Sequence, residues 1–190
     1  TRLLDFSLCE KVALYFAVCS SLVKDSNVSY QDEITSFLED GHELGLSDNG
    51  AAVYCIEPEE LNRKSSIFII KDNQNPIFDF KDITLEKLRV IDTPICIKTN
   101  NSDKRIIAQK GTFMVFGYQY SSLDYYNSFQ ENITKIFIPN TFRYKIKKEL
   151  EENFNISHLT IYPDMKGIAL KITDEINKMY IKDCEEVFGT

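Results

Sequence analysis

The pattern of apolar and polar positions begins with a short strand that leads directly into a helix. Residues 1–7 (TRLLDFS) place two leucines and a phenylalanine around the charged residues Arg2 and Asp5. This pattern predicts a strand that buries both charges, and buried charges need partners. Strand ends that carry polar groups of this kind are also where α+β and α/β folds build sites. The segment is therefore a first candidate for chemistry.

An amphipathic helix is predicted over residues 8–23. Ser7 and Glu10 have the Ser-x-x-Glu spacing of a capping box, which marks the helix start. Val12 and Tyr15 lie on one face of this helix, as a core-facing stripe requires. A polar insertion follows over residues 24–50. It contains a second possible helix, which begins near Ser29 and ends near residue 40.

Strands and helices alternate through the rest of the chain. Strands are predicted at residues 51–56, 94–98, 112–116 and 133–138. Helical segments are predicted at residues 57–62, 84–88, 141–154 and from about 163 to 187. Residues 104–111 lead into the strand at 112–116, and residues 67–70 fit strand or helix equally. This interleaving predicts one α+β domain over residues 1–190.

Composition narrows the functional classes. The chain has 190 residues, of which 43% are hydrophobic and 12% aromatic, so it can build a core. Its formal net charge of −7 argues against non-specific binding to nucleic acids. The longest apolar run, residues 12–18, is far shorter than a membrane span.

The cysteines and histidines favour no metal or hydrolase chemistry. Five cysteines are present and none has C-x-x-C spacing, which predicts a reducing, cytoplasmic location. The two histidines, His42 and His158, stand apart from any cluster of metal ligands. No Ser-His-Asp or Cys-His arrangement is indicated. We therefore expect neither a bound metal nor a resident cofactor.

Two polar residues before the strand at 112–116 stand out. Gln109 lies between apolar positions and is followed by Gly111. Its amide suits a ligand amide or a ribose hydroxyl, and it suits unpaired backbone groups equally well. Arg105 suits a phosphate group, but an ion pair with Asp5 is the plainer interpretation.

Several segments together resemble the FRG domain family. Residues 1–7, followed by VALYFA at 12–17, resemble the family pattern T-R-L-L-D-W-T and then A-L-x-F-A. RIIAQKGTF at 105–113 resembles its R-x-x-x-Q-x-G-x-F motif. AVYCI at 52–56 with LN at 61–62, IFIP at 136–139 and LTIYPDMKG at 159–167 follow in the family's order. The resemblance covers nearly the whole chain.

The chain departs from that family in two ways. Phe6 stands where the family usually has tryptophan, and the family's upstream F-R-G segment and His-x-Gly stretch are not present. The resemblance therefore implies an N-terminally incomplete domain. It also implies that the missing segment can associate as a separate piece and complete a site.

A weaker similarity to ADP-ribosyltransferases suggests a chemistry. It implies a mixed, mostly antiparallel sheet with flanking helices, with residues 1–7 as the strand that supports NAD. In this interpretation Asp5 and Gln109 are the catalytic candidates. Thr1, Arg2, Ser7 and Arg105 are the candidates for binding the nucleotide.

Two functional hypotheses follow. The first is a bacterial domain, with a role in defence against phage or in toxicity, that handles NAD or a related nucleotide as substrate. If active, it would be an ADP-ribosyltransferase-like or NAD-glycohydrolase-like enzyme. The second is a non-catalytic domain that recognises a protein or a phage component. In that case Arg2, Asp5, Arg105 and Gln109 form a buried polar network that stabilises the fold.

Overall fold

The computed structural model describes most of the chain. The described residues are 2–19, 50–65, 76–100, 103–117, 121, 123–164, 167–169, 172–173, 175–177 and 179–180. The helix predicted after Ser29 and the ambiguous segment 67–70 lie outside these residues.

The strands form two sheets. The larger has the order β1-β5-β4-β3 and contains β1 (Leu3–Ser7), β5 (Gly111–Val115), β4 (Ile95–Lys98) and β3 (Phe78–Asp79). In this sheet β3 runs parallel to β4, whereas β1 and β4 run antiparallel to β5. The smaller sheet pairs β2 (Gly50–Ile56) with β6 (Ile133–Pro139) in antiparallel fashion. The prediction of an α+β fold with a mixed sheet is confirmed.

Short and medium helices connect these strands. The α-helices are α1 (Glu10–Cys19), α3 (Pro58–Lys64), α5 (Leu85–Val90), α6 (Lys104–Gln109), α7 (Asn140–Phe154) and α8 (His158–Ile161). The 3-10 helices are η1 (Phe80–Asp82), η2 (Leu123–Tyr125) and η3 (Asn127–Asn132). Beyond α8, the described residues between 167 and 180 are helical. None of the helices in the described part of the chain has the length and apolar composition needed to cross a bilayer.

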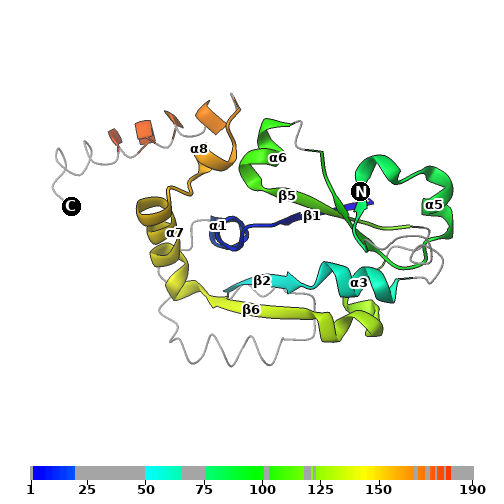
Figure 1. Ribbon diagram of the computed structural model, residues 1–190. Coiled ribbons are helices and arrows are strands. Elements are labelled where there is room, and N and C mark those ends of the chain that lie inside the picture. The colour runs from blue at the N-terminus through cyan, green and yellow to red at the C-terminus, as the bar shows by residue number, and fades with distance from the viewer. Residues whose placement is uncertain are drawn as a thin grey trace.

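Helix α1 lies at the centre of the fold (Figure 1). β1 runs directly into it, β5 and α6 lie on one side of it, and β2 with β6 lie on the other. Its buried residues Val12, Tyr15 and Val18 pack with Ile138 of β6 and with apolar residues of α7 and α8. The predicted apolar face of the first helix is therefore confirmed as a core face.

The larger sheet is covered on both faces. Met114 and Cys96 point to one face and pack with Leu61 of α3. The alternate residues Val115 and Ile95 point to the other face, where they belong to a separate apolar cluster. Successive strand residues alternate between the two faces, so β4 and β5 read as nearly continuous apolar runs. The edge strand β1 is more accessible, because its residues Leu3, Leu4 and Asp5 are exposed.

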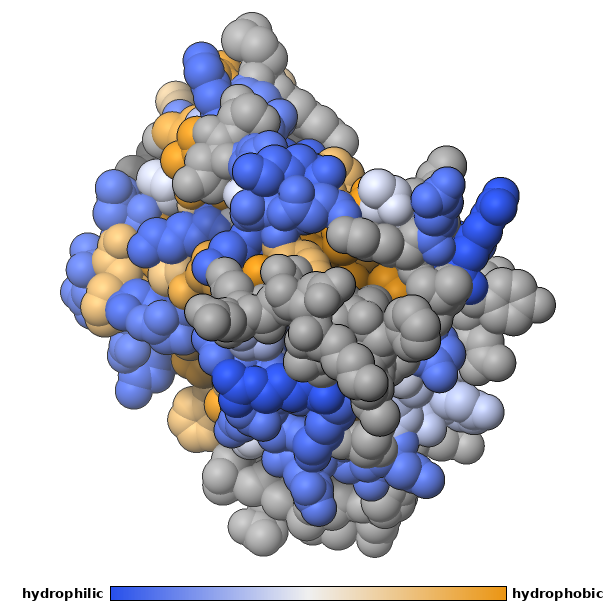
Figure 2. Space-filling view, turned by 45° about the vertical axis from the view of Figure 1, so that its right-hand side comes forward, coloured by the Kyte–Doolittle hydropathy of each residue, from blue (hydrophilic) through white to orange (hydrophobic). Residues whose placement is uncertain are grey.

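One face of the molecule shows how polar and apolar residues are distributed on the surface. Among the coloured residues of Figure 2 most are hydrophilic, and the hydrophobic ones gather in a band across the middle of the view.

Most predicted elements are confirmed, with three corrections. Residues 104–109 form helix α6 and do not simply extend the approach to β5. Ser7 does not cap α1, because β1 continues through Ser7 opposite Gly111 and the helix begins only at Glu10. The apolar spacing within residues 141–154 predicts that Phe142 and Leu150 face inward; Leu150 is buried, whereas Phe142 is 42% exposed.

Candidate functional site

The end of β1 meets α6 and α8 at a polar junction. The Ser7 hydroxyl donates to the Gln109 carbonyl oxygen at 2.8 Å and accepts from the Cys9 backbone N–H at 3.1 Å. The Leu8 N–H donates to the carbonyl oxygen of Lys110 at 2.9 Å. The turn from β1 into α1 is therefore fixed against the end of α6. Ser7 and Gln109, both predicted as site residues, are brought together here.

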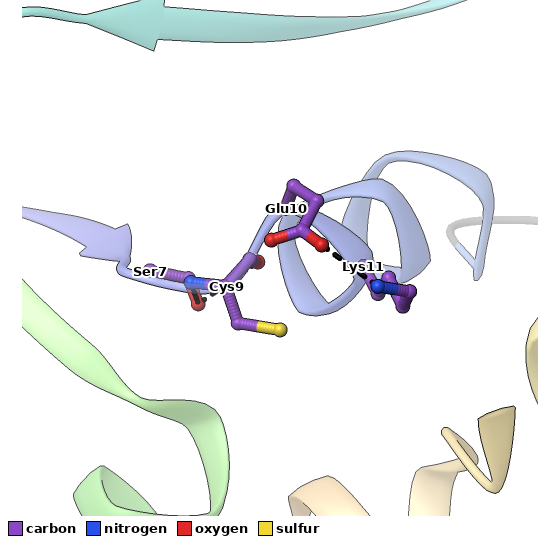
Figure 3. A network of polar contacts seen from close by, with 4 residues as sticks. All are labelled: Ser7, Cys9, Glu10 and Lys11. Carbon is purple, nitrogen blue, oxygen red and sulfur yellow. Dashed lines mark hydrogen bonds and ion pairs between the residues drawn. The ribbon is translucent and has the colours of Figure 1, made fainter.

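The first turn of α1 carries an exposed ion pair beside this junction. Figure 3 shows Glu10 and Lys11 on the helix, with the Cys9 side chain directed away from Glu10. The Glu10 carboxylate lies 2.8 Å from the Lys11 Nζ. That hydrogen bond lowers the pKa of Glu10 and raises the pKa of Lys11. Glu10 therefore pairs with its neighbour and does not complete the predicted capping box with Ser7.

Local sequence signals explain why α6 forms. The Asp103 carboxylate accepts from the backbone N–H groups of Arg105 at 2.7 Å and Ile106 at 3.3 Å, as an N-cap does. The helix ends at Gln109. The next residue, Lys110, has a left-handed φ of 46°, and Gly111 then begins β5. A cap at each end fixes the position of Arg105 and Gln109 on this short helix.

Gln109 joins three segments of the chain. Its side-chain Nε2 donates to the Ile161 carbonyl oxygen of α8 at 3.1 Å, while its backbone carbonyl accepts from Ser7. The amide is thus engaged with the protein backbone. Of the two interpretations of Gln109, the pairing with backbone groups is the one that the structure displays.

Arg105 lies one helical turn before Gln109 and contacts the same part of the chain. Its guanidinium carbon is 4.6 Å from the centroid of the Tyr162 ring, a cation–π distance. The Tyr162 ring also packs on His158, with centroids 4.5 Å apart, and meets Phe16 edge-on. Arg105 is exposed, and no hydrogen bond or ion pair of its guanidinium is found in the described part of the chain. This arrangement leaves the guanidinium able to bind an anion.

Asp5 is placed differently from the prediction. Its side chain is exposed and stands opposite Phe113, on the same face of β1 as Ser7. Among the described residues, no hydrogen bond or ion pair of the Asp5 carboxylate is found, including with Arg2 or Arg105. The expectation that this charge is buried is wrong, because β1 is an edge strand and its residues from Leu3 to Asp5 are exposed on both faces.

Arg2 lies at the other end of β1. Its Nη1 donates to the Gly117 carbonyl oxygen at 2.9 Å, and its own carbonyl oxygen accepts from the Phe116 N–H. Arg2 is exposed, so its predicted burial is also wrong. The four residues of the hypothesised network, Arg2, Asp5, Arg105 and Gln109, do not form one buried network. Thr1 lies outside the described residues.

Sequence reasoning did not identify Tyr162 and His158 as site residues, although they lie on the α8 side of the junction. Their spacing of four residues is a signal that two rings share one side of a short helix. The His158 Nε2 is buried without a hydrogen-bond partner in the described part of the chain. Within those same residues no cluster of three or more His, Cys, Asp or Glu could hold a metal ion.

The site as a whole offers few available groups. Ser7, Gln109 and Arg2 are engaged with the backbone, whereas the Asp5 carboxylate and the outer part of Arg105 are exposed. A carboxylate can stabilise a developing positive charge, and a guanidinium can bind phosphate. Comparisons with family models, curated proteins and solved structures found no match for this chain.

Proposed function

We propose that this chain is an FRG-like domain with an ADP-ribosyltransferase-like site that handles NAD or a related nucleotide. The observation that supports this proposal is the Asp5 carboxylate. It is exposed on a strand that leads directly into a core helix, and no partner for it is found among the described residues. Because no described protein group occupies it, the carboxylate is available to contact a ligand.

The chemistry of NAD cleavage gives this carboxylate a task. Breaking the glycosidic bond to nicotinamide develops an oxocarbenium-like positive charge on the ribose, which a nearby carboxylate stabilises. Arg105 supplies a guanidinium that can bind the pyrophosphate, and its cation–π contact with the Tyr162 ring helps to hold it in place. Ser7 and Gln109 then act as positioning residues that fix the end of β1 against α6.

Calorimetric titration with NAD tests this proposal. We expect the 190-residue chain to bind NAD and the Asp5→Asn variant to bind at least tenfold more weakly. Because Asp5 is exposed, the variant should keep the melting temperature of the wild type. Glu149→Gln removes an exposed carboxylate from α7 and is the matched control. An absence of NAD binding by the wild type, or equal binding by Asp5→Asn, would reject the proposal.

A non-catalytic recognition domain for a protein or phage component is the second candidate. It is favoured by the engagement of Gln109 with α8 and by the stacking of Arg105 on Tyr162, because both contacts also serve to hold the fold. In this interpretation the charge of Asp5 prevents the edge strand β1 from pairing with strands of other chains. Asp5→Asn would then leave ligand titrations unchanged and increase aggregation, which light scattering would detect.

A further inference from the structure

Two adjacent residues between α6 and β5 contradict the preferences of the backbone that they occupy. Lys110, which follows α6, has a left-handed φ of 46°, and Gly111 begins β5. Glycine adopts a left-handed φ without steric cost, whereas a residue with a Cβ does not. Glycine also weakens the strand that contains it. The two residue types thus stand in the reverse of the order that the backbone favours.

The conformation of Lys110 is fixed by its neighbours. Its N–H donates to the Ile107 carbonyl oxygen at 3.1 Å, and its own carbonyl oxygen accepts from the Leu8 N–H at 2.9 Å. Asn155 is the other non-glycine residue with a positive φ in the described part of the chain. Asparagine tolerates that conformation because its short polar side chain hydrogen-bonds locally, which lysine cannot do. The end of the helix alone therefore does not explain a lysine at this position.

Packing does not explain the glycine at position 111 either. A Cβ added to Gly111 would lie 3.6 Å from the Ile106 side chain, its nearest neighbour, which is an ordinary van der Waals distance. By contrast, a Cβ at Gly50, Gly117 or Gly167 would collide with neighbouring atoms. The φ of Gly111 also lies outside the left-handed region. Residues that break a local preference in this way are found at functional sites.

Both residues border the candidate site. Gly111 lies opposite Ser7 in the pairing of β1 with β5, and Asp5 is its diagonal neighbour two residues along β1. Residues that pair across two strands point to the same face, so the bare backbone at Gly111 lies on the face that carries Asp5. Such diagonal positions are about 7–8 Å apart, a distance that one sugar ring of a nucleotide can bridge.

The Lys110 ammonium supplies a positive charge beside this surface. Lys110 is exposed, and no hydrogen bond or ion pair of its side chain is found among the described residues. The pKa of Glu10 is lowered chiefly by its hydrogen bond with Lys11, and the charge of Lys110 lowers it further. The Lys110 charge therefore acts at the first turn of α1. Because Glu10 is already paired with Lys11 at 2.8 Å, Lys110 is left to attract an anion.

We propose that Lys110 and Gly111 contact the ligand of the candidate site. The Lys110 ammonium binds a phosphate group, and the sugar attached to that phosphate lies against the backbone of Gly111. This inference rests on the proposed function and adds the residues that determine how the nucleotide lies. With its phosphate at Lys110 and its ribose over Gly111, the nucleotide presents its glycosidic bond to the Asp5 carboxylate. A side chain at position 111 would occupy the place of the sugar.

Calorimetric titration of the 190-residue chain with NAD and, separately, with inorganic pyrophosphate tests this proposal. Lys110→Gly should bind both ligands about tenfold more weakly than the wild type, and Lys110→Arg should restore pyrophosphate binding because it keeps the charge. Gly111→Ala should bind NAD about tenfold more weakly but pyrophosphate like the wild type, because its methyl group obstructs only the sugar. Asn155→Gly changes the left-handed residue after α7 and is the matched control, which should bind both ligands normally.

Thermal melts separate contact with the ligand from a role in folding. Lys110→Gly should melt at or above the wild-type temperature, because glycine removes the steric cost of the positive φ. Gly111→Ala should not melt lower either, because the new Cβ has room and restricts the unfolded chain. A lower melting temperature of either variant would overturn the proposal, since that residue would then serve the fold.

The titrations also distinguish this inference from the proposed function. If the wild type binds NAD and Asp5→Asn weakens that binding, but Lys110→Gly and Gly111→Ala bind like the wild type, the inference is wrong and the proposed function stands. If the wild type binds pyrophosphate but not NAD, and Lys110→Gly loses pyrophosphate, the proposed function and the sugar contact are wrong and the phosphate contact stands. A wild type that binds neither ligand overturns both.

Discussion

Asn62 is the residue whose replacement should most weaken the larger sheet. It lies on α3 and is 1% exposed. Its side-chain Nδ2 donates to the carbonyl oxygens of Pro76 at 2.7 Å and Cys96 at 2.8 Å, and its Oδ1 accepts from the Cys96 N–H at 2.6 Å. The amide thus takes the place of a neighbouring strand along β4, where the short β3 does not reach.

The cost of Asn62→Ala follows from the groups that lose a partner. One buried N–H and two carbonyl oxygens would lose hydrogen bonds, at about 1–3 kcal/mol for each group that is left unsatisfied. The carbonyl oxygens have second lone pairs and relax more easily than the N–H. We therefore expect a loss of about 3–5 kcal/mol in the free energy of unfolding, a large part of the stability of a domain this size.

Urea denaturation followed by circular dichroism measures this loss. Asn127→Ala is the control, because Asn127 is an exposed amide and its removal should cost less than about 0.5 kcal/mol. Asn62→Asp adds a second test, since its ionised carboxylate would face two carbonyl oxygens. Burial would raise the pKa of that carboxyl, so the variant should gain stability as the pH falls and the group becomes protonated. A loss below about 1 kcal/mol for Asn62→Ala, with an unchanged m-value, would refute the role assigned to this amide.

Three further predictions concern single positions. Gln109→Glu replaces the N–H donor that faces the Ile161 carbonyl oxygen with an acceptor, so it should lower the free energy of unfolding by about 1–2 kcal/mol in thermal melts. An unchanged melting temperature would show that the hydrogen bond from Gln109 to Ile161 is not formed. Gly117→Ala should destabilise the fold by about 2 kcal/mol or more, because the new Cβ would lie 2.0 Å from the Ile91 carbonyl oxygen, and denaturant midpoints measure this. Burial raises the pKa of Cys96 to about 12, so the free energy of unfolding should fall as the pH rises from about 9 towards 12. In the native protein a thiol reagent should modify the exposed Cys55 but not the buried Cys96.

The sequence predicted most of the strands because their patterns are local. Alternating or continuous apolar runs at 51–56, 94–98, 112–116 and 133–138 all form strands. Pro58 also begins a helix, as its fixed φ favours at a first helical position. The pairing order β1-β5-β4-β3 could not be predicted, because it depends on contacts between distant segments.

Two local errors have a common cause. The Ser-x-x-Glu pattern at Ser7 and Glu10 is a genuine capping signal, but pairing of β1 with β5 extends the strand through Ser7. The segment 104–109 resembles the approach to a strand, yet the Asp103 cap and the left-handed Lys110 close it into a helix. In both places tertiary pairing or an end cap outweighed the pattern of the segment itself.

The candidate site shows what a sequence motif leaves open. Ser7 and Gln109 are 102 residues apart, and their contact joins the end of β1 to the end of α6. The sequence identified both residues but could not indicate that they bind each other and the α8 backbone. A loss of activity in a Ser7 or Gln109 variant would therefore report first on the position of α6 and α8. Asp5 makes no such contact in the described residues, so its variant separates chemistry from folding most directly.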